Sequence, residues 1–147
     1  MKPIGYWLNR TDRALTRSMD ATLEEFGLTR IAWQVLNTLR ETPDSADADV
    51  LEALSANADT DTLTIAVGTV LADGWAMRPA PDRLALSDSG RERLTAVAQR
   101  VDTFRATAMT GITPDEFRAA VLVLERMTHN VETAMSAASP ALTAAAS

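Results

Sequence analysis

The sequence predicts a mainly α-helical protein with one small β-hairpin, and two observations support this. Apolar residues recur at three- or four-residue spacing along several long segments, as they do in amphipathic helices. Two short runs, 75–78 and 83–86, flank the turn sequence Pro79-Ala80-Pro81-Asp82, which is typical of a hairpin. With 147 residues, 46% of them hydrophobic and 23% charged, the chain has the size and composition of one globular domain.

Four helices are expected before the hairpin. The first covers 4–26, the second runs from Thr29 to near Pro43, the third opens at Asp44-Ser45, and the fourth covers 60–73 and is capped by Asp59-Thr60. Gly27 is suited to end the first helix because glycine readily adopts a positive φ. Pro43 ends the second because the residue before a proline disfavours the helical conformation.

Two longer helices are expected after the hairpin. Ser87 or Asp88 caps the first, which ends at Gly111. Thr113-Pro114-Asp115-Glu116 then combines a capping threonine, a proline at the first helical position and a glutamate three residues after the cap. Residues 137–147 are rich in alanine and serine, and we expect them to form a flexible tail.

Apolar stripes on the helices at both ends of the chain indicate a homodimer. One domain of this size does not easily bury the stripes of 4–26 and 88–136 together with the tryptophan-containing N-terminus. A second copy of the chain would cover them, so we expect the two chain ends to hold a dimer together.

Acidic and basic residues are segregated along the chain, whose formal net charge is −6. Residues 44–76 contain seven acids and no base. Residues 77–106 contain six arginines and four acids. A DNA-binding surface built from the first of these segments would lack its own phosphate-neutralising charge.

Several function classes have no support in the sequence. The absence of cysteine excludes thiol chemistry, and His129 alone cannot form a zinc site. No glycine-rich phosphate loop or nucleophile motif is present, so we expect no enzyme, no catalytic residues, no metal and no cofactor. No apolar run approaches about 18 residues, and no signal sequence is recognisable, so we expect a cytoplasmic protein that does not cross a membrane.

The order of the elements is that of a winged helix-turn-helix. A helix ends at Gly74, a short run reaches Arg78, the hairpin carries Asp82-Arg83, and a second run leads into a new helix. Over about residues 4–136 the chain resembles the MarR family of bacterial transcription regulators. The residues that carry the resemblance are Leu28-Thr29 with Trp33, Leu36 and Leu39; Thr62-Leu63-Thr64; Val70 to Gly74 with Arg78; Asp82-Arg83; and Leu86-Ser87-x-x-Gly90.

The resemblance implies a single MarR-like domain over 1–136. Within it, 29–87 would form the winged helix-turn-helix, and 4–26 and 88–136 would be mainly dimerisation helices. It further implies that the homodimer binds double-stranded DNA, with helix 60–73 in the major groove and the wing, 76–87, at the minor groove. The candidate DNA-binding residues are Thr60, Thr62, Thr64, Arg30, Arg78 and Arg83.

The chain departs from the family in the segment that would read DNA. Where many members carry arginine after the Thr-x-Thr motif and again one turn later, this sequence has Ile65 and Thr69. The wing is short, and the family pattern of Asp followed by two arginines is reduced to Asp82-Arg83-Leu84. Each candidate arginine also has an alternative interpretation as a solvated surface residue.

A candidate ligand site lies in the aromatic residues of the first two helices. Tyr6, Trp7, Arg10 and Trp33 would suit a planar anion, and many members of the family release DNA when a small aromatic or phenolic acid binds. The alternative is that Trp7 and Trp33 belong to the core or to the dimer interface.

Two functions therefore remain open. The first is a dimeric DNA-binding regulator of MarR type, which a small aromatic ligand would relieve. The second is a MarR-like dimer with weak or lost DNA binding, which acts through a small-molecule ligand or a protein partner because its reading face is acidic.

Overall fold

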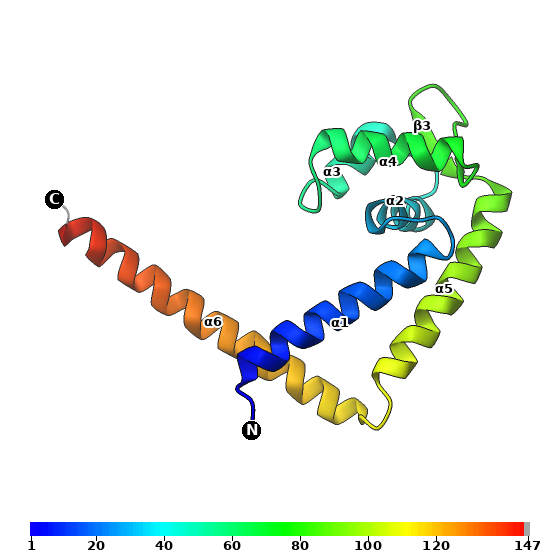
Figure 1. Cartoon of the computed structure of the whole chain (residues 1–147). Coiled ribbons are helices and arrows are strands. Elements are labelled where there is room, and N and C mark those ends of the chain that lie inside the picture. The colour runs from blue at the N-terminus through cyan, green and yellow to red at the C-terminus, as the bar shows by residue number, and fades with distance from the viewer. Residues whose placement is uncertain (146–147) are drawn as a thin grey trace. The chain divides into compact units, whose positions relative to one another are not determined.

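A computed structural model describes residues 1–145, which fall into two compact units, one of Met1–Ala106 and one that begins at Thr107 (Figure 1). The elements in chain order are α1 (Ile4–Glu24), α2 (Arg30–Glu41), β1 (Ser45–Ala46), α3 (Asp47–Ala53), α4 (Thr60–Ala72), β2 (Ala76–Met77), β3 (Arg83–Leu86), α5 (Asp88–Ala108) and α6 (Pro114–Ala145). The predicted fold class, mainly helical with a small β wing, is confirmed.

Helix ends in the first unit follow the capping residues. The Thr29 hydroxyl accepts a hydrogen bond from the Ala32 amide at 3.1 Å, and the Asp59 carboxylate accepts one from the Thr62 amide at 2.7 Å. Gly27 and Gly74 have φ of 71° and 78°, values that glycine adopts without steric penalty. The predicted starts of α2 and α4 are therefore confirmed by the hydrogen bonds that begin them.

The wing is part of a three-stranded antiparallel sheet of order β1-β3-β2. The short strand β1 differs from the prediction that the third helix opens at Asp44-Ser45. Asp44 instead has a φ of 56°, and Ser45 and Ala46 extend beside Leu84 and Arg83 of β3. Helix α3 consequently starts at Asp47.

A single hydrophobic core holds the first unit together. Leu23, Val35, Leu36, Leu84 and Val97 are each fully buried in it, and they come from α1, α2, β3 and α5. Helix α2 contacts α1, α3, α4 and β3, so it is the central element of the unit. This central position holds α4 and the wing in a fixed relation to each other.

The junction between the wing and α5 is tightly packed. The Ser87 hydroxyl donates to the Gly74 carbonyl at 2.6 Å and accepts from the Gly90 amide at 2.8 Å. A Cβ added to Gly90 would lie 1.8 Å from the Trp75 carbonyl oxygen. The buried Trp75 ring is also covered by the Arg93 guanidinium, whose carbon lies 3.7 Å from the ring centroid.

The second unit consists mainly of α6. The Thr113 hydroxyl accepts from the Glu116 amide at 3.1 Å, and the Glu116 carboxylate accepts from the Thr113 amide at 3.0 Å, which confirms the expected capping box. The helix continues to Ala145, beyond Ser136, where we expected the flexible tail to begin. Alanine is the strongest helix former, and it dominates this segment; residues 146–147 of the expected tail lie outside the described part of the chain.

Neither a membrane-spanning helix nor a metal site is found among the described residues. None of the helices there combines the length and apolarity needed to cross a membrane. Within the same part of the chain, no three metal-ligating side chains come together.

Candidate nucleic-acid interface

Helix α4 is fixed by its inner face and exposes its outer face. Leu63, Ala66, Val67 and Val70 are buried, and α4 contacts α2, α3 and β2. The Asp59 cap lies at its start, and the amide hydrogen bond from Thr62 lowers the pKa of the Asp59 carboxyl below its ordinary value. The capped, inward-packed helix therefore presents its remaining residues to solvent in a fixed geometry.

The three candidate threonines are all exposed but do not form one cluster. Residues two apart on an α-helix point about 200° apart, so Thr62 lies on the opposite edge of the outer face from Thr60 and Thr64. The Thr64 hydroxyl donates to the Thr60 carbonyl at 2.8 Å, so its proton is already engaged inside the helix. Thr62 instead lines a groove between the start of α2 and α4.

This α2–α4 groove lies beside the outer face of α4. It has a volume of about 290 Å³, and it is lined by Gly27, Thr29, Ile31, Ala32, Thr62, Ile65, Ala66 and Thr69. None of these side chains is charged. Arg30 adjoins the groove in sequence, and its guanidinium donates to Asp20 at 3.2 Å.

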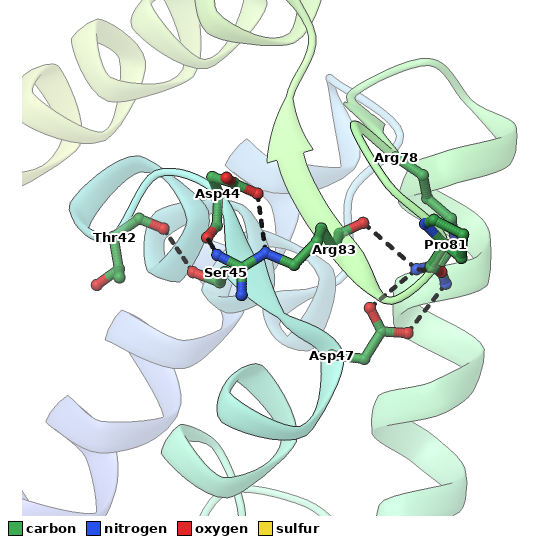
Figure 2. Close-up of polar contacts among 7 residues, drawn as sticks. All are labelled: Thr42, Asp44, Ser45, Asp47, Arg78, Pro81 and Arg83. Carbon is green, nitrogen blue, oxygen red and sulfur yellow. Dashed lines mark hydrogen bonds and ion pairs between the residues drawn. The ribbon is translucent and has the colours of Figure 1, made fainter.

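Arg78 is engaged at the base of the wing. Figure 2 shows its guanidinium facing the Asp47 carboxylate, to which it donates two hydrogen bonds of 2.9 and 3.0 Å. It also donates to the Pro81 and Arg83 carbonyls at 3.2 and 3.4 Å. The hydrogen bond with Asp47 raises the pKa of Arg78 above its ordinary value, so this arginine is a permanent cation with a bound counter-charge.

Arg83 is held by Asp44 in a similar way. Its Nε donates to the Asp44 carboxylate at 3.0 Å, and its Nη2 donates to the Asp44 carbonyl (Figure 2). The left-handed backbone of Asp44, which aspartate tolerates better than most residues, accompanies this double contact. The side chains of Arg83 and Asp44 remain 42% and 59% exposed, so water and competing anions can reach the pair.

Two of the arginines that follow the acidic segment are thus paired in space with carboxylates of that segment. Asp44 and Asp47 neutralise the two wing arginines that the sequence analysis named as DNA-binding candidates. Arg91 pairs with Asp88 at 2.9 Å, and Arg93 donates to the Asp73 carbonyl at 3.0 Å. Sequence reasoning found the arginines but missed these partners, because ion pairs between segments about 30 to 40 residues apart leave no local pattern.

The four candidate ligand residues are not brought together. Tyr6 and Trp7 form an edge-to-face pair at 5.1 Å, and Arg10 donates to the Tyr6 hydroxyl at 2.6 Å. Trp33 instead packs against the core of the first unit. It is not among the residues that line the groove containing Tyr6 and Arg10.

Two further arginines belong to that groove on α1. Its lining consists of Tyr6, Asn9, Arg10, Arg13, Ala14 and Arg17, around a volume of about 480 Å³. Arg10, Arg13 and Arg17 follow an i, i+3, i+7 spacing, which places them on one face of the helix. Arg13 and Arg17 were not among the predicted ligand residues, although this spacing could have identified them.

Comparisons with known proteins identify the fold. No family model and no curated protein sequence matches the chain. Among solved structures, the reduced form of MarR from Escherichia coli is 19% identical, with a TM-score of 0.67 over 86% of this chain and 94% of that one. A MarR family protein of Mycobacterium tuberculosis in complex with DNA is 22% identical, with a TM-score of 0.68 over 86% and 98%.

A third solved structure of the same fold concerns a ligand. BpsR of Bordetella bronchiseptica, described with a mechanism by which 6-hydroxynicotinic acid regulates its DNA binding, is 21% identical, with a TM-score of 0.65 over 86% of this chain and 94% of BpsR. The chain therefore has the MarR-type winged-helix fold, as the sequence resemblance implied.

Proposed function

We propose that the protein is a dimeric, DNA-binding transcription regulator of MarR type. The observation that carries the proposal is the arrangement of α4, which is capped, packed on α2 by its inner face and exposed along its whole outer face next to the wing. An α-helix held in this way fits the major groove of B-DNA. A solved structure with the same fold is a complex with DNA, which supports the same use here.

In this proposal α4 reads base edges and the wing lies over the neighbouring minor groove. Thr60, Thr62 and Thr64 lie on the reading helix, and Arg30, Arg78 and Arg83 provide contacts to phosphate or to the minor groove. The arginines reach DNA by exchanging their carboxylate partners for phosphates. Exposed ion pairs contribute only about 0–1 kcal/mol, so this exchange is inexpensive.

We further propose a homodimer formed by the two ends of the chain. On α6, exposed apolar side chains include Phe117, Val121, Leu122, Val123, Met127, Val131 and Met135. On α1, Ile4, Trp7, Leu8 and Leu15 are also exposed, by 42% or more. So many exposed apolar side chains on each of two helices are unusual for a monomeric protein, and a second copy is the occupant that both helices fit.

Ligand control is proposed for the groove on α1. Tyr6 offers an aromatic face, and Arg10, Arg13 and Arg17 offer cationic donors, which suit a small aromatic acid. The structure of BpsR, whose DNA binding is described as regulated by 6-hydroxynicotinic acid, supports this class of ligand for the fold. Trp33 is assigned no part in this site.

A second candidate function is favoured by the ion pairs at the wing. If Asp44 and Asp47 retain their arginines in the presence of DNA, the protein binds DNA weakly and acts through a ligand or a protein partner instead. The two candidates differ in one measurable property, which is specific retention of DNA.

Sheared genomic DNA of the source organism, incubated with the purified full chain at low salt, separates the two candidates. Enrichment of particular intergenic fragments in the bound fraction is the result expected for a regulator. A bound fraction with the same composition as the input would contradict the regulator and favour the second candidate.

A further inference from the structure

The outer face of α4 has a central row of four exposed residues. Asp61, Ile65, Gly68 and Ala72 follow i, i+4, i+7 and i+11 spacing, so they form one line along the helix, opposite the buried Leu63, Val67 and Val70. A helix inserted into a groove presents this line to the floor of the groove. The row therefore decides which base edges the helix can read.

Ile65 protrudes from the row. Its side chain is 70% exposed, more than that of any other large hydrophobic residue between α2 and β3. Gly68 and Ala72 leave open space along the row beyond it, and a Cβ built on Gly68 would meet nothing within 4 Å. Ile65 also borders the uncharged α2–α4 groove, together with Ile31 and Thr69.

The hydroxyls of three threonines lie near Ile65, and all of them are already engaged. The Thr62 hydroxyl is hydrogen-bonded to the Asp59 carboxylate, whose pKa the Thr62 amide and this hydroxyl lower together. Thr64 donates to the Thr60 carbonyl at 2.8 Å, and Thr69 donates to the Ile65 carbonyl at 3.0 Å. These two threonines can present methyl groups and oxygen lone pairs. The face around Ile65 is therefore apolar or hydrogen-bond accepting.

Base edges in the major groove differ in what they require. Guanine shows two acceptors and is read by arginine or lysine, and adenine is read by asparagine or glutamine. None of these four residue types occurs in α4, whose sequence is TDTLTIAVGTVLA. Thymine is the base that offers an apolar group there, its C5-methyl, and apolar side chains read it by contact.

We propose that Ile65 is a specificity-determining residue that reads thymine through its C5-methyl group. This inference rests on the proposed DNA-binding function and deepens it by naming the base chemistry that α4 recognises. The carboxylate of Asp61, one turn before Ile65, adds an acceptor that disfavours the acceptor-only edge of guanine and suits the amino group of cytosine at a neighbouring base pair, so it leaves the apolar contact with thymine to Ile65. The DNA sites of this protein accordingly contain thymine where Ile65 lies.

The test uses DNA chemistry first and a variant second. Duplexes are selected by the full-length protein from a randomised pool at low salt, and each thymine of the tightest duplex is then replaced in turn by deoxyuridine, which lacks only the methyl group. For the wild-type protein, one or two replacements in each half-site should weaken binding by about fourfold each, the effect of one buried methyl group. Replacements at the other thymines serve as the internal control.

Variants at Ile65 then test whether this residue is the one that contacts the thymine methyl group. For Ile65→Ala, replacing the sensitive thymines by deoxyuridine should no longer weaken binding, so the thymine and deoxyuridine duplexes should bind with equal affinity. Ile65→Leu keeps an apolar side chain of the same size and should retain part of the discrimination.

Three results would overturn the inference, and they separate it from the proposed function. Selected duplexes that bind tightly but tolerate deoxyuridine at every position would refute the thymine contact while leaving a DNA-binding regulator. Equal deoxyuridine sensitivity in wild type and Ile65→Ala would assign the methyl contact to another residue. A pool from which no duplex is selected would refute both the thymine contact and the proposed DNA-binding function.

Discussion

The guanidinium of Arg78 and the carboxylate of Asp47 form a two-point ion pair, with Nη1–Oδ1 and Nη2–Oδ2 distances of 2.9 and 3.0 Å. The pair joins the end of β2 to the first residue of α3, next to the second pair formed by Arg83 and Asp44 (Figure 2). In the proposed complex with DNA, the carboxylates that stabilise the base of the wing would therefore compete with phosphate for its two arginines.

Removal of the Asp47 charge should strengthen DNA binding. In Asp47→Asn, Arg78 no longer has to give up a carboxylate before it contacts a phosphate, so affinity should rise for all sequences. The number of phosphate contacts stays the same, so the salt slope should not change. Polarisation titrations at several salt concentrations measure both quantities. Because the Arg78 and Asp47 side chains are 36% and 37% exposed, the variant should lose no more than about 1 kcal/mol of stability.

Arg83→Ala tests whether the wing clamps DNA. The loss of one phosphate or minor-groove contact should weaken binding to all sequences alike and reduce the salt slope by about one. Arg100→Ala is the matched control, since Arg100 also forms an exposed two-point pair, with Glu25 at 2.9 and 3.1 Å, but lies three turns along α5 from the wing. An affinity that is equally unaffected in both variants would remove Arg83 from the interface.

Two glycine substitutions should change stability in opposite directions. Gly90→Ala places a Cβ 1.8 Å from the Trp75 carbonyl oxygen, and the forced shift of backbone should cost about 1–3 kcal/mol or more. Gly68→Ala adds a Cβ in open space within α4 and should stabilise the protein by roughly 0.5–1 kcal/mol. Chemical denaturation of both variants checks the pair; equal effects would mean that the packing of Gly90 on Trp75 is not tight in solution.

The Asp59 cap should make part of the stability depend on pH. The folded-state pKa of Asp59 lies below its ordinary value of 3.8, so its contribution is fully present above that value and is lost as the pH falls through the folded pKa. Asparagine caps helices as well as aspartate does but does not titrate. The melting temperature of Asp59→Asn should therefore fall less than that of wild type on acidification below about pH 4; parallel curves would contradict the charged cap.

A charge on the apolar face of α6 should break the proposed dimer. Val131 is 58% exposed in the single chain, and Val131→Asp would bury a carboxylate in the interface. Sedimentation should report a dimer for wild type and for the control Ser136→Asp, which changes an exposed polar residue about 140° around the same helix from Val131. It should report a monomer for Val131→Asp.

The parts of the fold that local chemistry dictates could be predicted from the sequence. The Thr29 and Asp59 caps, the Thr113–Glu116 capping box and the hairpin before Ser87 each depend on a few neighbouring residues. The strand β1 could not be predicted, because its two residues are extended only through their pairing with β3.

The candidate site was less accessible to sequence reasoning. The arginines of the wing were found by composition, whereas their pairing with Asp44 and Asp47 depends on the tertiary contact between β1 and β3. Trp33 was a ligand candidate because aromatic side chains together with one arginine suit a planar anion, but in the structure it packs against the core. Long-range packing, rather than residue type, decided both outcomes.

Salt-dependent DNA binding tests the central claim most directly. Fluorescence polarisation of the purified protein would be measured against DNA from its own upstream intergenic region, at low and at physiological salt, with unrelated DNA as competitor. A dimeric regulator should bind tightly, resist the competitor and lose affinity steeply as salt rises. The absence of binding even at low salt would contradict the account and would mean that the acidic residues keep the arginines of the wing.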